Sequence, residues 1–123
     1  MNKLGINLWN WVPGLGEACL GLPAKVADMG FTAIELPMTV PDPGAALEQE
    51  IRSTGLAVSL CAALGAGRDL SSFDAEVRRS TLQYLTQCLQ TGERLGATVL
   101  AGPLYAGGGK RHALPPDERS REW

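Results

Sequence analysis

The stretch Gly30-Phe31-Thr32-Ala33-Ile34-Glu35-Leu36 decides the fold, because it joins a glycine that can end a helix to an apolar run that can form a strand. Glycine suits the left-handed position just after a helix, where a Cβ atom would clash. The same pattern follows Gly55 and Gly96, and another apolar run opens the chain. The predicted strands are Leu4–Leu8, Phe31–Leu36, Leu56–Cys61 and Ala97–Ala101. Their nearly continuous apolar character is typical of strands covered on both faces.

Apolar residues recur at helical spacing between these runs. The three sets are Leu22, Val26 and Met29; Ala46, Leu47 and Ile51; and Val77, Leu82, Leu85 and Leu89. The third set is the clearest helix, because Ser71, Ser72 and Asp74 precede it and can accept bonds from its first N–H groups, where Glu76 adds favourable charge. Pro115–Pro116 predicts the start of a fourth helix, since proline is tolerated in a first turn.

Alternating strands and helices predict right-handed crossovers and a parallel sheet. Two architectures fit, an open doubly wound sheet and a closed eight-stranded barrel with its strands in sequence order. A dinucleotide-binding sheet would need GxGxxG directly after the first strand, whereas Asn7–Pro13 stands there. Eight βα units take about 250 residues. We therefore expect residues 1–123 to be an incomplete TIM-barrel domain that runs from the first strand to the start of the fourth helix.

The charge and composition of the chain exclude several classes of binding partner. The chain of 123 residues has a net charge of −2 and a pI near 5.3, so it lacks the clustered positive charge by which proteins bind nucleic acid or anionic lipid. Three widely spaced cysteines without a CxxC pair predict reduced thiols in the cytoplasm. No stretch is long enough to span a bilayer. A small polar substrate remains the favoured partner.

Function in a barrel sits where strands run into the following loops. Trp9 and Trp11 follow the first strand, and their rings could stack on the apolar face of a sugar or cover the barrel mouth. Glu35 ends an apolar strand at the rim of the predicted pocket, where it is the best acid candidate, with capping of a neighbouring loop as the structural alternative.

The remaining candidates are weaker. Cys61 closes the third strand without a recognisable histidine partner, which favours a small residue in the pocket wall over a nucleophile. His112, in the loop Gly107–His112, is the only histidine and is expected to be solvated, because a metal needs three or four ligands. The same loop lacks the ending of a phosphate-binding loop, so we expect a lid.

Several motifs together resemble the sugar-phosphate isomerases/epimerases of the xylose-isomerase-like barrel superfamily, with the D-tagatose or D-psicose 3-epimerases most similar. The resemblance covers the whole chain. The motifs are Gly5-Ile6-Asn7, Gly30-Phe31 with Ile34-Glu35-Leu36, Leu70-Ser71-Ser72 with Val77-Arg78, and Gly102-Pro103-Leu104-Tyr105.

This resemblance implies proton transfer next to a ketose carbonyl, assisted by Mn²⁺ or Mg²⁺. Such enzymes hold the metal with two Glu, one Asp and one His on later strands, so it implies no catalytic residue and no metal ligand in this chain. Substrate-binding positions are implied by the resemblance or expected at the strand ends: Asn7, Trp9, Trp11, Glu35, Cys61, Gly102, Pro103, Leu104 and Tyr105. The first-strand position is often aromatic in such enzymes, and Asn7 therefore leaves the ketose undetermined.

Other functions remain open at this point. An inosose-dehydratase-like lyase or a phosphate-ester nuclease would use the same barrel, although the acidic balance speaks against the nuclease. A small flavodoxin-like ligand-binding protein would instead show the strand order 2-1-3-4. Half a barrel also leaves two strand edges unpaired, so we expect the 123-residue chain to aggregate or to form homo-oligomers through these edges.

Overall fold

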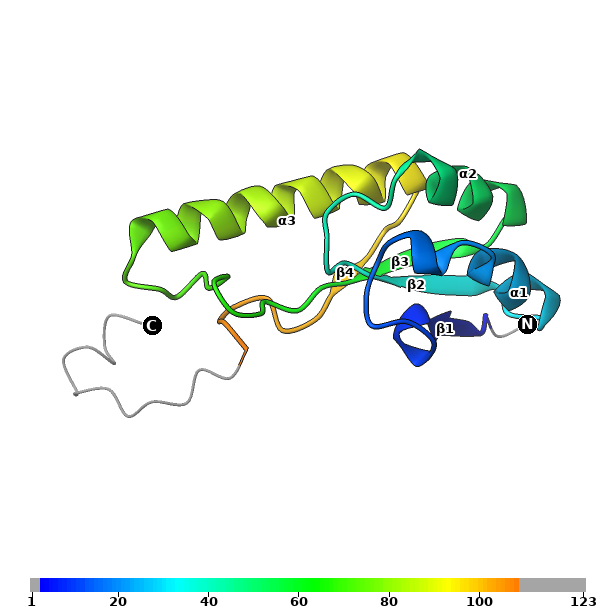
Figure 1. Ribbon diagram of the computed structural model, residues 1–123, viewed down its shortest axis with the longest axis horizontal. Helices are drawn as coiled ribbons and strands as arrows, with labels where there is room; N and C mark the ends of the chain where they lie inside the picture. The colour runs from blue at the N-terminus through cyan, green and yellow to red at the C-terminus, as the bar shows by residue number, and fades with distance from the viewer. Residues whose placement is uncertain (1–2, 109–123) are drawn as a thin grey trace.

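The structure is a computed structural model that describes residues 3–108. Figure 1 shows one sheet with helices above it. The elements are β1 Gly5–Asn7, α1 Leu22–Asp28, β2 Ala33–Pro37, α2 Ala45–Thr54, β3 Ala57–Cys61, α3 Ala75–Leu95 and β4 Leu100–Ala101, with short 3-10 helices at Leu8–Asn10 and Glu17–Cys19. The expected fourth helix at Pro115–Pro116 and His112 lie outside the described residues.

The four strands pair in parallel in the order β1-β2-β3-β4. This order confirms the predicted barrel wall and contradicts the flavodoxin-like order 2-1-3-4. Because all pairings are parallel, the carboxyl ends of the strands lie at one edge of the sheet. The loops that follow the strands therefore start together, as the sequence predicts.

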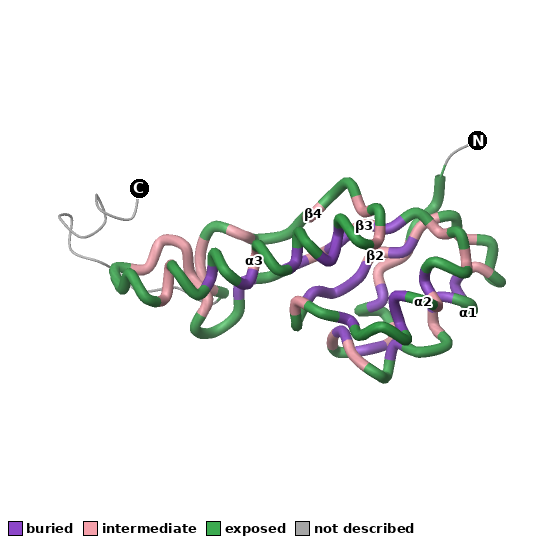
Figure 2. Tube along the Cα trace, turned by 90° about the horizontal axis from the view of Figure 1, so that it is seen from above, coloured by how far each residue is buried: buried purple, intermediate pink, exposed green. Residues whose placement is uncertain are grey.

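Helices α1, α2 and α3 all cover the same face of the sheet (Figure 1). On that face the strands present Ile34, Leu36, Val58 and Leu60, which are buried against the helices. The alternate residues Ala33, Glu35 and Ser59 face the other way and are only partly buried. The expectation that strands are covered on both faces is therefore met on one face within residues 3–108, and Figure 2 shows buried positions gathered around β2, β3 and α2.

Helix α3 forms as predicted, but its predicted leucine stripe packs only in part, since Leu85 contacts the core in a half-buried position. Leu82 and Leu89 are each 57 % exposed. The helix instead buries Thr81, Tyr84, Cys88, Thr91 and Gly92. The polar groups of this face find partners, since the Tyr84 hydroxyl donates to the Met38 carbonyl and the Thr91 hydroxyl to that of Pro41. The buried face of α3 thus carries hydroxyl groups that form hydrogen bonds with backbone carbonyls of the β2–α2 connection.

The ends of the elements follow local chemistry. The Asp74 carboxylate accepts a 2.8 Å bond from the Glu76 N–H and caps α3, as predicted. Gly96 takes φ = 69° at the end of the same helix. The first strand is shorter than predicted because the Asn7 side chain caps the 3-10 helix that begins at Leu8. The fourth is shorter because Ala97 still bonds back to the Gly92 carbonyl of the helix end.

The chain segments after β3 and β4 continue side by side beyond the sheet. The Ala62 N–H donates to the Ala101 carbonyl at 2.9 Å, and the Leu64 N–H donates to the Pro103 carbonyl at 3.4 Å. Between these bonds Gly102 has φ = 130°, and a Cβ atom there would lie 1.8 Å from the Ala62 carbonyl oxygen. Only glycine permits this close approach.

We expect Gly102→Ala to lower the free energy of unfolding by at least about 2 kcal/mol, because the added methyl group forces the two segments apart. Gly65→Ala is the matched control, since it lies in the loop after β3 and a Cβ there would meet nothing within 4 Å. Its effect should stay within about 0.5 kcal/mol. Urea denaturation measures both, and equal midpoints for the two variants would contradict the steric argument.

Candidate functional site

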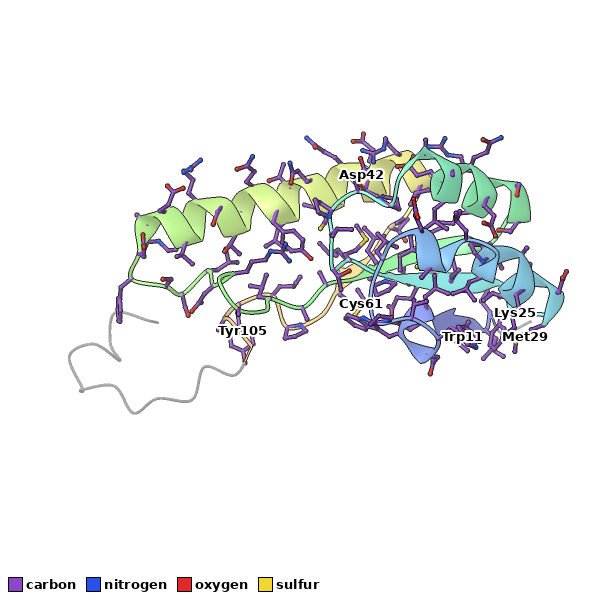
Figure 3. All side chains as sticks on the ribbon, in the orientation of Figure 1. Trp11, Lys25, Met29, Asp42, Cys61 and Tyr105 are labelled. Carbon is purple, nitrogen blue, oxygen red and sulfur yellow. The ribbon has the colours of Figure 1, made fainter. Side chains whose placement is uncertain are left out.

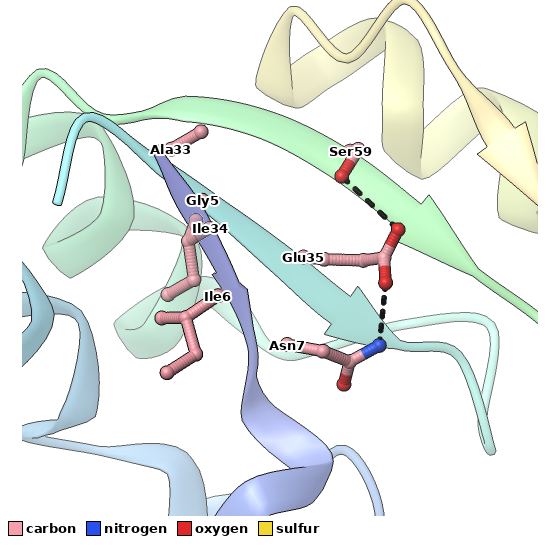
Figure 4. Close-up of a pocket in the computed structure, with 7 residues that line it drawn as sticks. All are labelled: Gly5, Ile6, Asn7, Ala33, Ile34, Glu35 and Ser59. Atoms are coloured by element: carbon pink, nitrogen blue, oxygen red, sulfur yellow. Dashed lines mark hydrogen bonds between the residues drawn. The ribbon is translucent and has the colours of Figure 1, made fainter. Parts of the chain in front are cut away.

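The strand register brings three polar side chains into one row on the open face of the sheet. Asn7 pairs with Glu35 across β1 and β2, and Glu35 pairs with Ser59 across β2 and β3. The Asn7 side-chain amide donates to Glu35 Oε2 at 2.6 Å, and the Ser59 hydroxyl donates to Glu35 Oε1 at 3.4 Å. Figure 4 shows the three side chains on the same side of the strands, with both bonds converging on the carboxylate.

This row forms one wall of a cavity of about 230 Å³. Gly5 and Ala33 stand next to the row and are too small to fill the space, which is also lined by Ile6 and Ile34. A carboxylate has about four acceptor positions on its two oxygens. Glu35 therefore keeps acceptor capacity after bonding Asn7 and Ser59, and the cavity gives a hydroxyl-bearing molecule access to it.

The Glu35 carboxylate gives the cavity wall a negative charge that no cation of residues 3–108 offsets by an ion pair. Among residues 3–108, neither lysine nor arginine lines the cavity or forms an ion pair with Glu35. The ion pairs of the described chain lie elsewhere, as when Arg94 bonds Glu48 at 2.7 Å and links α3 to α2. The described wall is therefore suited to neutral polar molecules and repels anions.

Asn7 joins this row to the loop after β1. Its side-chain oxygen accepts the Trp9 N–H at 2.8 Å, and its carbonyl accepts the Asn10 side-chain amide at 2.7 Å. These bonds close the 3-10 helix Leu8–Asn10. One residue thus contacts both the carboxylate in the cavity and the turn that carries Trp9.

Cys61 lies on the same face as the row, two residues after Ser59, and is half-buried. Burial raises the pKa of its thiol, the neighbouring charge of Glu35 raises it further, and the Asn7 side chain acts in the opposite direction. The neutral thiol is therefore favoured. A nucleophile needs the thiolate, so this environment does not favour a nucleophilic role, and Cys61 itself is not among the residues that line the cavity.

The two tryptophans after β1 do not line the cavity. Trp9 is 39 % exposed, and its indole N–H donates to the Pro13 carbonyl at 3.3 Å. Trp11 packs against the core, and the Lys25 ammonium of α1 lies 5.8 Å from the centre of its ring. Figure 3 shows Trp11 beside Lys25 and apart from Cys61. The aromatic contact of Trp11 is thus with α1, whereas the surface of Trp9 is open.

The segment Gly102–Tyr105 lies beyond the sheet. Pro103 contributes its carbonyl to the bond with Leu64, and Leu104 packs against the core. Tyr105 is 77 % exposed and lies far from Trp11 in Figure 3. The structure therefore brings Asn7, Glu35 and Cys61 close together, whereas Gly102–Tyr105 do not line the cavity.

Ser59 was not predicted as a site residue. The signal that could have found it is its place two residues before Cys61, which puts both side chains on one face of a strand. Only the register then sets Ser59 opposite Glu35. Sequence alone does not supply that pairing.

The described residues do not fit a divalent metal, because within 3–108 there is no group of three His, Cys, Asp or Glu side chains that could hold one. A single carboxylate bound to an amide and a hydroxyl is too small a ligand set for such an ion.

A helix that spans a membrane must be both long and apolar. None of the helices within residues 3–108 is long and apolar enough to cross a membrane.

A family model of xylose isomerase-like TIM barrels matches residues 23–123. The chain belongs to this family. No curated protein matches the chain. Solved structures support the fold: an L-ribulose 3-epimerase is similar with a TM-score of 0.80 at 28 % identity. This match covers 99 % of the present chain and 42 % of the epimerase chain.

Two further solved structures give the same picture. A D-allulose 3-epimerase from Methylomonas sp., in complex with D-allulose, is similar with a TM-score of 0.82 at 19 % identity, over 98 % of this chain and 43 % of its own. A D-psicose 3-epimerase from Clostridium cellulolyticum H10, with D-tagatose, has a TM-score of 0.76 at 19 % identity. This match covers 98 % of the present chain and 45 % of the epimerase chain. The chain thus spans less than half the length of these proteins and has the fold of the N-terminal half of a TIM barrel.

The raised pKa of Cys61 predicts a slow rate of alkylation of its thiol. We expect iodoacetamide to modify Cys61 more slowly than a free cysteine at pH 8, because a raised pKa reduces the thiolate fraction. Cys19 and Cys88 are buried and should react more slowly still. Glu35→Gln removes a charge that raises the pKa and should speed the reaction about two- to threefold. Peptide mass spectrometry over time measures each rate.

The control for this substitution is Glu17→Gln, which removes the same charge from an exposed residue outside the cavity. Its rate of Cys61 modification should match that of the wild type. An unchanged rate in Glu35→Gln, or an equal change in both variants, would contradict the assigned effect of Glu35.

Proposed function

We propose that this chain is the N-terminal half of a ketose 3-epimerase and that it supplies one wall of the sugar pocket. The observation that carries the proposal is the carboxylate of Glu35, held in an open cavity on the face that a TIM barrel encloses. The similarity to three ketose 3-epimerases supports it. Hydroxyl groups of a sugar are the donors that such an acceptor requires.

Each of the expected site residues has a part in binding. Glu35 accepts sugar hydroxyls in the cavity, Cys61 presents a neutral thiol beside Glu35, and the exposed ring of Trp9, which lies outside the cavity, covers an apolar sugar face that projects from it. Asn7 belongs to the same wall. Gly102–Tyr105 form the rim together with the loop after β3. Trp11 does not contact the sugar; its ring packs on Lys25 of α1 and supports the loop after β1.

Proton removal and return next to the ketose carbonyl require an acid/base pair that the described residues do not provide. In the proposed full-length protein, residues of later strands supply this pair together with a divalent ion, Mn²⁺ or Mg²⁺, which would polarise the carbonyl. The part of this chain is to bind and orient the sugar. The 123-residue chain by itself should be inactive.

The charge of the wall bears on the substrate. A phosphate group near Glu35 would meet a like charge with no described cation to offset it. Free ketoses are therefore the proposed substrates, in preference to their phosphates.

We expect the full-length protein to epimerise D-fructose or D-tagatose in the presence of Mn²⁺, to be at least about tenfold slower on their phosphates, and to lose activity with a chelator. The 123-residue chain should show no turnover under any of these conditions. Chromatographic separation of the ketose products measures both proteins.

Two results would contradict the proposal. Turnover by the 123-residue chain would show that the chemistry resides in these residues. A full-length protein that prefers the phosphates would show that Glu35 does not determine the charge of the substrate.

A further inference from the structure

We propose that Asn7 is a positioning residue, which aims the Glu35 carboxylate at a sugar hydroxyl and couples that carboxylate to the turn that carries Trp9. The inference rests on the proposed sugar-binding function and adds a residue that acts through another. It separates Asn7 from Glu35, which contacts the sugar itself.

The geometry around Glu35 supports this division of roles. The Asn7 amide holds Oε2 at 2.6 Å, the shorter of the two bonds to the carboxylate, whereas Ser59 holds Oε1 at 3.4 Å. A glutamate side chain has three rotatable bonds and loses much conformational freedom when it is fixed. A donor on the neighbouring strand fixes it before the sugar arrives, and this lowers the cost of binding.

The Asn7 side chain already uses both its amide nitrogen and its oxygen in hydrogen bonds. Its oxygen accepts the Trp9 N–H at 2.8 Å while its nitrogen donates to Glu35. Both ends of one planar amide are thus engaged, and the plane of this amide relates the carboxylate to the 3-10 helix Leu8–Asn10. A change at residue 7 should therefore affect the carboxylate and the turn together.

Two substitutions separate these effects. Asn7→Asp keeps an oxygen that accepts the Trp9 N–H, but it replaces the donor to Glu35 by a second carboxylate. Asn7→Ala removes both bonds. Gln49→Glu is the control, because it makes the same change from amide to carboxylate at an exposed residue of α2 outside the cavity.

The kinetic test uses the full-length protein loaded with Mn²⁺ and D-fructose or D-tagatose as substrate. Asn7→Asp and Asn7→Ala should each raise KM about tenfold and leave kcat within about threefold, because they weaken binding of the sugar and not the proton transfer. Gln49→Glu should leave KM within about twofold. In a Glu35→Ala background, Asn7→Asp should have almost no further effect, since it keeps the bond from the Trp9 N–H and the group that Asn7 positions is gone.

A second readout needs no sugar. In ¹H–¹⁵N NMR spectra a short bond to a carboxylate shifts the amide proton that donates it, so Glu35→Ala should move the Asn7 side-chain signal. The exchange of the Trp9 amide should rise at least about tenfold in Asn7→Ala and stay within about threefold of wild type in Asn7→Asp. This readout also shows whether each variant is folded.

The possible outcomes separate a failure of the proposed function from a failure of the positioning role of Asn7. A wild-type protein that epimerises no ketose would refute the proposed function, and the NMR readout would then still test the Asn7–Glu35 contact. An active wild type with unchanged KM in both Asn7 variants would refute the positioning role alone. An equal loss from Asn7→Asp with and without Glu35, or from Gln49→Glu, would overturn it as well, because the effect would then not pass through the carboxylate.

Discussion

Within residues 3–108, helices cover one face of the parallel ladder β1-β2-β3, and this constraint places alternate strand residues in two different environments. Successive side chains of a strand point to opposite faces, so Ile34, Leu36, Val58 and Leu60 meet the helices and make the core. The residues between them form the other face. A shift of one residue in the register would exchange the two sets and bury Glu35. Correct pairing is thus required for both stability and the site.

The polar row follows from the same constraint. Because the strands are parallel and in register, residues at equivalent depth lie side by side, and Asn7, Glu35 and Ser59 occupy one level of the sheet. None of the three forms a site alone. Together they hold a carboxylate between two donors next to small residues, and this leaves both space and acceptor capacity for a ligand.

The likeness to longer epimerases gives this half of the molecule its context. The chain covers less than half of each of the three structures compared, and its described residues hold no group of side chains that could bind a metal. The proposed function therefore divides the work: these strands would orient a neutral sugar, and the proton transfer would fall to other strands. Within residues 3–108, Leu82 and Leu89 of α3 are exposed, and β1 and β4 are the outer strands of the sheet.

The sequence by itself determined the elements, their order and the parallel sheet, because helix-ending glycines, caps such as Asp74 and apolar runs act over a few residues. It also indicated Glu35 as the carboxylate of interest. Only the tertiary structure decided which face of α3 packs, since Leu82, Leu85 and Leu89 share one helical spacing, yet Leu85 packs against the core while the other two are exposed. The bond from Asn7 to Glu35 likewise depends on the register between strands that are 28 residues apart in the chain, and no local pattern encodes that register.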